Sequence, residues 1–146
     1  MNKNCHHATE VYPDLLLGGL DDVPEMVDLG ADVLVPLDHL PADVWSTGFR
    51  GEILYCPAPD MGVLPRDVLD RLVDAVIQRL GHGRAVGIFC LGGHGRTGYV
   101  VACVLSRLGV KEPVAYLRRV YCHKAVETAR QMDEVLSYSH QSGQES

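Results

Sequence analysis

A cysteine and an arginine six positions apart bound the segment of this chain whose residue types can do chemistry. Cys90 and Arg96 enclose Leu-Gly-Gly-His-Gly, and Thr97 follows the arginine directly. Glycines allow backbone amides to crowd around one point, and such a loop at a helix N-terminus binds anions. A thiolate is a strong nucleophile, and the planar guanidinium of arginine matches two oxygens of a tetrahedral oxyanion. The segment therefore predicts a cup that binds such an anion and attacks it.

The plainer interpretation of the same residues is a buried structural cysteine followed by an ordinary glycine turn. Chance assembly of these residue types in this register is rare, although short motifs always carry false positives. An ATP-binding loop is excluded, because no Gly-Lys-Ser/Thr follows the glycines.

Length and composition favour one globular domain covering residues 1–146, with a frayed tail after about residue 139. The chain has 146 residues, 47% apolar content and a net charge of −6. We expect no nucleic-acid surface, because such a surface needs a basic patch, and no membrane association. Met1–His7 lacks the apolar core of a signal peptide, so we expect a cytoplasmic protein, as a monomer.

The five cysteines form no Cys-x-x-Cys pair and no even framework. They are Cys5, Cys56, Cys90, Cys103 and Cys122. A zinc or thioredoxin-like site is therefore not expected, and reduced thiols are the simplest prediction.

Strand-like and helix-like segments alternate along the chain. Apolar runs predict strands at Val11–Leu17, Asp32–Leu37, Glu52–Cys56 and Arg84–Cys90. Helical spacing of apolar residues, with glycine or proline at the boundaries, predicts helices at Asp22–Leu29, about Arg66 to Leu80, near Arg96 to Leu108, Pro113 to about Tyr121 and from about Thr128 onward. This alternation predicts an α/β three-layer fold around a mostly parallel sheet of four to five strands. The Cys90 loop then lies at the carboxyl end of a central strand, where such sheets bind ligands.

With these segments in place, the chain resembles the dual-specificity and protein-tyrosine phosphatase superfamily. The signature Cys-x5-Arg-Ser/Thr is present at residues 90–97, and weaker matches occur in the family's order. These are Tyr12-Pro-Asp-Leu-Leu-Leu-Gly, Gly30-Ala-Asp-Val-Leu-Val-Pro, Pro59-Asp60-Met-Gly and Ala125-Val-Glu-Thr-Ala-Arg-Gln131. The likeness covers nearly the whole chain.

The resemblance implies a two-step phosphomonoester hydrolysis without metal or other cofactor. Cys90 would attack phosphorus to form a phosphocysteine, and water would then hydrolyse it. Arg96 would clamp the phosphate and Thr97 would donate its hydroxyl to the departing sulfur. The phosphate would be held by the backbone amides of Leu91, Gly92, Gly93, His94, Gly95 and Arg96.

The resemblance also implies an aspartate acid on a loop about thirty residues before the cysteine. Asp60 has that position, although an aspartate beside proline and glycine is commonly a solvated turn residue. Asp67 and Asp70 are rivals by distance, but both belong to the predicted helix. Gln131 matches a glutamine that positions water in several branches, and a surface helix glutamine is an equal alternative.

Several positions depart from the family pattern. Phe89 stands where most members carry a histidine that helps to hold the loop and the thiolate. We expect His94 to be a solvated rim residue rather than a basic phosphoinositide contact. The stretch from Tyr121 to Lys124 replaces the usual Arg-Pro-Gly. Cys56 could form a protective disulfide with Cys90, or it could be a buried cysteine at a strand end.

The predicted function is a dual-specificity-type protein phosphatase acting on phosphotyrosine and phosphoserine/threonine. Asp38, His39 and Trp45 lie in a loop that can reach the cleft. The alternatives are a phosphate-binding module with little activity, a phosphatase of a small phosphomonoester such as an inositol phosphate, and a sulfur-transfer or arsenate-reducing enzyme.

Overall fold

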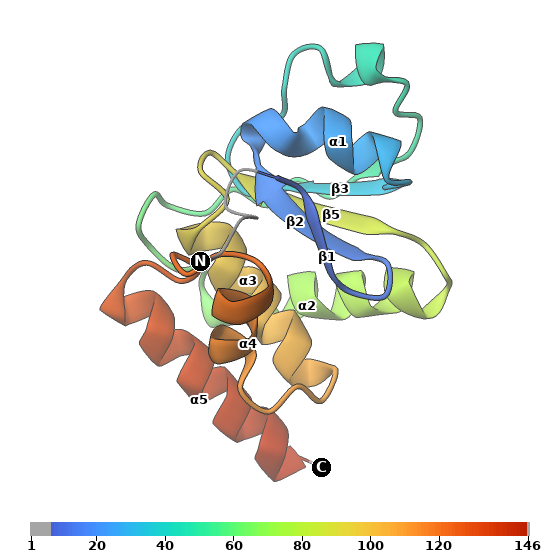
Figure 1. Ribbon diagram of the computed structural model, residues 1–146. Helices are drawn as coiled ribbons and strands as arrows, with labels where there is room; N and C mark the ends of the chain where they lie inside the picture. The colour runs from blue at the N-terminus through green and yellow to red at the C-terminus, as the bar shows by residue number, and fades with distance from the viewer. Residues whose placement is uncertain (1–6, 146) are drawn as a thin grey trace.

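The computed structural model describes residues 7–145, with side chains for residues 7–139. Its sheet contains β1 (Thr9–Tyr12), β2 (Leu15–Gly19), β3 (Val33–Pro36), β4 (Glu52–Ile53) and β5 (Val86–Cys90). The order across the sheet is β1-β2-β5-β3-β4, and only β1 is antiparallel to its neighbour (Figure 1). β5 is therefore the central strand, which confirms the predicted mostly parallel sheet.

The first predicted strand is wrong as a single element. Val11–Leu17 is interrupted at Pro13 and Asp14, and the chain reverses there to make a hairpin of β1 and β2. Asp14 has a φ of 68°, in the left-handed region that aspartate tolerates in turns. Its N–H donates to the Glu10 carboxylate at 2.8 Å, which fastens the turn.

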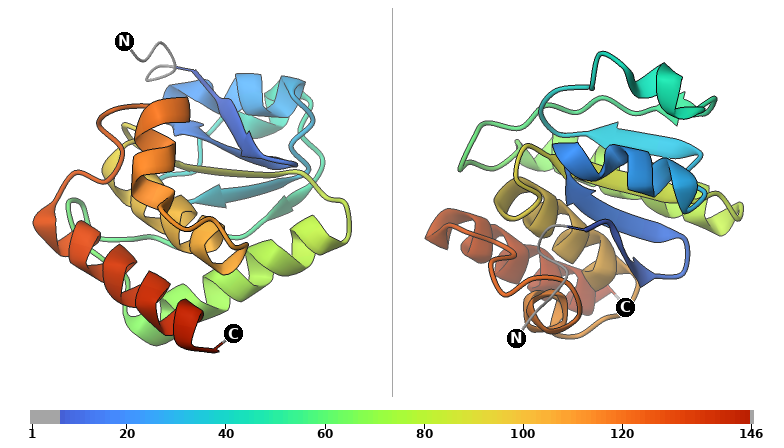
Figure 2. Two further views of the ribbon diagram at one scale, coloured as in Figure 1. Left: turned by 60° about the horizontal axis from the view of Figure 1, so that its bottom comes forward. Right: turned by 45° about the horizontal axis from the view of Figure 1, so that its top comes forward.

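The helices cover the sheet unequally, as Figure 2 shows. One face carries the short α1 (Val23–Asp28) and the 3-10 turn Val44–Thr47. The other face carries α2 (Arg66–Gly81), α3 (Gly95–Arg107), α4 (Pro113–Val120) and α5 (Ala129–Glu145). The predicted three-layer arrangement is confirmed. Among the helices of residues 7–145, none combines the length and the apolar character that crossing a bilayer requires.

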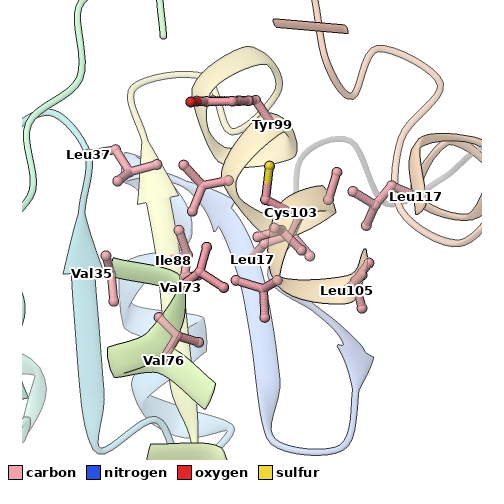
Figure 3. Packing of buried hydrophobic residues seen from close by; sticks show 14 of the residues in the cluster. Leu17, Val35, Leu37, Val73, Val76, Ile88, Tyr99, Cys103, Leu105 and Leu117 are labelled. Carbon is pink, nitrogen blue, oxygen red and sulfur yellow. The ribbon is translucent and has the colours of Figure 1, made fainter. Parts of the chain in front are cut away.

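Side chains of β5 alternate between two apolar clusters. Val86, Ile88 and Cys90 face the larger cluster, which Figure 3 shows between strand residues such as Leu17 and helix residues such as Val73. Phe89 faces the smaller cluster beneath α1. Each such buried side chain contributes about 1.5–3 kcal/mol to folding. Because successive side chains of a strand alternate between the two faces of a sheet, Phe89 and Cys90 lie on opposite faces.

The last helix covers the segment for which the sequence predicts a frayed tail. α5 continues through residues 140–145.

The structure tests the predicted reduced state for four of the five cysteines. Cys5 lies outside the described residues. Cys56, Cys90 and Cys103 are free thiols, whereas Cys122 is disulfide-bonded, so the prediction of reduced thiols is wrong for Cys122.

Candidate active site

The cysteine loop lies where the central strand ends. β5 ends at Cys90, residues 91–94 form the loop, and α3 begins at Gly95. Because β5 has parallel neighbours on both sides, this loop occupies the carboxyl edge at which such sheets bind ligands. Cys90 is only 3% exposed, and the N–H of Gly93 donates to its sulfur at 3.3 Å.

Gly93 fixes the loop against the rest of the sheet. Its φ is +78°, and a Cβ at this position would lie 2.6 Å from the backbone of Gly18. Only glycine allows both this conformation and this approach. The Leu20 N–H adds a backbone bond to the Leu91 carbonyl at 3.2 Å, so the loop is bound to the end of β2 at two points.

A buried tyrosine holds the same loop from the opposite side. The Tyr121 hydroxyl, at the end of α4, donates to the Gly93 carbonyl at 2.9 Å. Burial, followed by the nearby charges of Asp22 and Cys90, raises the pKa of Tyr121, so the hydroxyl remains a donor at neutral pH. The unusual segment after α4 therefore supplies an anchor for the loop.

Most amides of the loop remain available to an anion. Among residues 7–139, the N–H groups of Leu91, Gly92, His94 and Arg96 have no hydrogen-bond acceptor. The first amides of a helix have no intrahelical partner, and together they form an anion-binding concavity. Four backbone donors of the loop are thus unused by the described residues, as the predicted anion-binding cup requires.

Arg96 connects the cup to two other loops. It is 7% exposed, and Nη1 donates to the Ala58 carbonyl at 3.1 Å. Nη2 donates to Asp38 Oδ2 at 3.3 Å and lies 3.7 Å from Asp60 Oδ1. The expectation that the loop of Asp38 reaches the cleft holds for Asp38, which pairs with the arginine. Trp45 instead packs against Phe49, with ring centroids 5.6 Å apart.

Asp60 lies at the mouth of the pocket, and its side chain is 83% exposed. The ends of the loop of residues 57–65 that carries it are held, since Ala58 and Leu64 are buried and the Ala58 N–H donates to the Leu37 carbonyl at 3.0 Å. The Leu64 N–H donates to the Tyr99 hydroxyl at 3.3 Å. The rivals Asp67 and Asp70 lie on α2 in ion pairs with arginines of the same helix, and neither lines the pocket.

These elements enclose a pocket of about 130 Å³. Loop residues and residues of three other segments line it: Asp60, Met61, Cys90, Leu91, Gly92, Gly95, Arg96, Glu127 and Gln131. The pocket therefore brings together the predicted nucleophile, clamp, acid and glutamine. In the described part of the chain, no group of three or more histidine, cysteine, aspartate or glutamate side chains could hold a metal ion.

Gln131 is fully buried, so a surface position is wrong for it. Its backbone N–H donates to Thr128 Oγ1, and its side-chain oxygen accepts from the Thr128 N–H at 3.2 Å. This reciprocal pair is a capping box at the start of α5. The side-chain amide also donates to the Gly62 carbonyl at 3.1 Å, which ties α5 to the loop of Asp60. Both ends of the amide thus have partners.

Two other residues of the signature carry a buried polar atom without a partner. Thr97 is buried, and its hydroxyl has no hydrogen-bond partner among the described residues, so its donation to the departing sulfur stays a prediction. The Nε2 of His94 is buried and also has no partner among those residues. The expected solvated position at the rim is wrong for this nitrogen.

Cys56 lies too far from Cys90 for a disulfide without backbone movement. The Cys56 N–H donates to the Pro36 carbonyl of β3, and Pro36 is in register with Phe89 of β5. Strands lie about 4.8 Å apart, so one intervening strand puts the two cysteines roughly 10 Å apart, beyond the Cα limit of about 7 Å. Burial also raises the pKa of the Cys56 thiol. The disulfide interpretation is therefore wrong, and Cys56 is a half-buried free thiol three residues beyond the end of β4.

Two contacts of the cysteine loop and of the first residue of α3 were not predicted from the sequence. Glu127 accepts a hydrogen bond from the Gly95 N–H at 2.9 Å, and Tyr121 anchors Gly93. The sequence does offer a signal for Glu127, because it directly precedes Thr128 and Gln131, which form the capping box at the start of α5.

A buried cysteine at the end of a parallel strand, an amide cup and an arginine clamp are typical of cysteine-dependent phosphatases. Residues 20–145 match the family described as Swiss Army Knife protein, DSP-PTPase phosphatase domain. The chain belongs to this family of phosphatase domains, as the resemblance predicted.

The chain is also similar to individual proteins and to solved structures. The chain is 41% identical over 85 residues to an uncharacterized protein of Methanocaldococcus jannaschii, a match covering 58% of each. It is 34% identical over 112 residues to dual specificity protein phosphatase 12 of Mus musculus, covering 72% of this chain and 32% of that protein. The solved structure of Tk-PTP in the active form has a TM-score of 0.76 and 29% identity, covering 92% of this chain and 96% of that one.

The matched segment spans little more than half the length of the uncharacterized relative and about a third of the mouse protein. Activities and substrates of these whole proteins therefore enter only as proposals.

Proposed function

We propose that this chain hydrolyses phosphomonoesters through a phosphocysteine and acts on phosphorylated proteins. The observation that carries the proposal is the single pocket lined by Cys90, Arg96 and Asp60. The family supplies the phosphatase class, and the name of the mouse relative favours dual-specificity substrates. The small pocket at the surface favours several phosphoresidues over phosphotyrosine alone.

In the first step, the Cys90 thiolate attacks phosphorus while the ester oxygen leaves. Asp60 donates a proton to that oxygen, and its exposed position at the pocket mouth suits contact with a leaving group. The amide cup and the Arg96 guanidinium stabilise the charge on the three equatorial oxygens. The product of this step is a phosphocysteine and a free alcohol or phenol.

In the second step, water attacks the phosphocysteine and Asp60 takes a proton from it. The sulfur leaves as a thiolate, and the unpartnered Thr97 hydroxyl keeps its full capacity to donate to that sulfur. For Gln131 to position the water, it must release one of its present bonds. The bond to Gly62 is the one that movement of the Asp60 loop would break.

The apolar residue before the nucleophile is compatible with this proposal. Phe89 faces away from Cys90 into the cluster beneath α1, so it supports the loop by packing rather than by a hydrogen bond. If this substitution left the thiol unreactive, the chain would be the phosphate-binding module instead.

The test is hydrolysis of p-nitrophenyl phosphate by the protein and by Cys90→Ser. We expect the variant to fall to the uncatalysed rate, because a hydroxyl at its ordinary pKa is a poor nucleophile. Cys56→Ser is the matched control, since Cys56 is a half-buried free thiol outside the pocket, and it should retain full activity. A parent protein no more active than Cys90→Ser would contradict the proposal. Acid quenching followed by mass spectrometry should detect phosphate on the peptide containing Cys90.

A further inference from the structure

A carboxylate already occupies part of the anion-binding cup. Glu127 Oε1 accepts a hydrogen bond from the Gly95 N–H at 2.9 Å, and Glu127 lines the pocket beside Cys90 and Arg96. Gly95 is also the first residue of α3, where the helix dipole is most positive. A phosphate oxygen that takes this amide must displace Glu127 and then lie next to its negative charge.

The backbone around Glu127 directs this carboxylate into the pocket. Val126 has a φ of +63°, a conformation that a β-branched residue rarely adopts. It is held there by its N–H, which donates to the His94 carbonyl at 3.1 Å, and by Arg118, which donates to the two carbonyls before Glu127 at 2.9 Å each. The Glu127 N–H in turn donates to the Gln131 side chain at 3.0 Å. These four hydrogen bonds fix the backbone from which the Glu127 side chain extends.

The charges around the pocket are predominantly negative. Asp38 and Asp60 lie beside the Arg96 guanidinium, and Glu127 is the third carboxylate. Arg96 is the single lysine or arginine among the residues lining the pocket. The whole chain carries a net charge of −6, so the long-range field has the same sign.

We propose that Glu127 determines specificity by selecting phosphoprotein segments with lysine or arginine beside the phosphorylated residue. The inference rests on the proposed phosphatase function. One phosphate satisfies the cup and Arg96, but a second negative charge at the mouth meets the carboxylates of Glu127 and Asp38, and it gains nothing from Asp60, which is neutral while it serves as the acid. A cationic neighbour offsets the charge of Glu127 once Gly95 is taken by phosphate. Acidic flanks and polyphosphorylated small molecules are correspondingly disfavoured.

The test compares kcat/KM for two phosphotyrosine peptides of the same length, one with lysines and one with glutamates on both sides. Inositol hexakisphosphate serves as a polyanionic competitor. At low ionic strength we expect the lysine peptide to be favoured about tenfold. Glu127→Gln keeps an oxygen for the Gly95 N–H but removes the charge, so the preference should fall about threefold and inorganic phosphate should inhibit more strongly.

Asp133→Asn is the matched control for net charge. Asp133 is an exposed residue of α5 that does not line the pocket, and this variant should keep the preference of the parent protein. The inference is overturned if the parent protein uses both peptides equally, if the polyanion binds as tightly as the lysine peptide, or if Glu127→Gln leaves the preference unchanged.

A binding measurement separates this inference from the proposed function. Calorimetric titration of Cys90→Ser with the two peptides, with and without Glu127→Gln, requires no turnover. The same preference should be found in these affinities even if the parent protein hydrolyses nothing, which would refute the enzyme but not the selectivity. Equal affinities in this assay would refute the selectivity.

Discussion

Residues 90–96 and residues 57–65 line the same pocket, but the structure holds them very differently. The cysteine loop is buried at Gly93, which contacts the Gly18 backbone and receives the Tyr121 hydroxyl bond. The acid loop is exposed at Asp60 and is held mainly through Arg96, Tyr99 and Gln131. The Ala58 N–H also donates to the Leu37 carbonyl, directly after β3, at 3.0 Å, and Ala58 and Leu64 are buried, so the exposed part of this loop is its tip around Asp60.

The difference corresponds to the two tasks in the proposed reaction. Stabilising charge on a phosphoryl group requires donors that are in place before the charge develops. Protonating leaving groups of different shapes requires an acid that can shift its position, and an exposed loop tip moves at a lower cost than a buried loop. Arg96 couples the two, because it lines the cup and donates to the acid loop at Ala58.

The largest expected effect comes from a substitution in the buried cysteine loop. Gly93→Ala adds a Cβ at 2.6 Å from the Gly18 backbone, at a φ of +78°. We expect a loss of about 3 kcal/mol in the free energy of unfolding. We also expect kcat/KM to fall about 10³-fold, because the amide donors are displaced. Urea unfolding and p-nitrophenyl phosphate kinetics measure the two losses.

Gly83→Ala separates backbone strain from contact in that experiment. Its φ is +76° and no atom lies within 4 Å of the added Cβ. It should cost about 1 kcal/mol and leave activity unchanged. Equal losses in the two variants would show that the contact with β2 does not hold the cup.

For the exposed acid loop, we predict that a substitution lowers activity without lowering the free energy of unfolding. Asp60→Asn should lower kcat about 10²-fold for phenyl phosphate, whose leaving group needs protonation, and less for p-nitrophenyl phosphate. Its free energy of unfolding should change by less than about 0.5 kcal/mol, since the side chain is 83% exposed. Asp67→Asn, on the surface of α2, is the control. If Asp67→Asn lost the same activity, Asp60 would not be the acid.

Tyr121→Phe should have a smaller effect on both the free energy of unfolding and kcat/KM. Removing the hydroxyl leaves the Gly93 carbonyl without this donor, at a cost of about 1–2 kcal/mol and a several-fold lower kcat/KM. Tyr116→Phe removes a similar bond, to the Val11 carbonyl outside the pocket. It should lower the free energy of unfolding alone. Full activity in Tyr121→Phe would mean that the cup is held by Gly93 packing without this bond.

The smallest effect concerns the strand that leads into the acid loop. Hydrogen bonds from Arg79, and then from Arg84, lower the pKa of Glu52 against an opposing desolvation effect. Its native pKa lies below the usual 4.5, so the stabilisation is present above that pH and is lost as pH falls through the native pKa. Glu52→Gln should therefore cost about 0.5–1 kcal/mol at pH 7 and less at a pH below the native pKa.

Asp28→Asn, an exposed change on α1, gives the matched loss of charge for that measurement. It should leave the free energy of unfolding almost unchanged at both pH values. Phosphatase kinetics of Glu52→Gln should equal those of the parent protein, because the ion pair lies outside the pocket. A pH-independent loss in Glu52→Gln would attribute the effect to packing instead of charge.

Local sequence patterns were sufficient to predict the nucleophile and most of the strands and helices. The apolar run before Cys90 and the glycines before Arg96 predict β5, the loop and α3, because strand, turn and helix preferences act over a few residues. The family resemblance added Asp60, which the structure brings to the pocket mouth. The hairpin at Pro13 and Asp14 was missed, although its turn residues were a readable signal.

What the sequence determined by itself is the cup, since Cys90 and Arg96 are joined by a short loop whose geometry is local. Only the tertiary structure decided its partners: Asp38 on the clamp, Tyr121 on Gly93 and Glu127 on Gly95, at separations of 58, 28 and 32 residues. Such contacts depend on how strands and helices pack, and neither periodicity nor turn chemistry encodes which distant side chains will meet. The charge around the phosphate site is therefore a property of the fold.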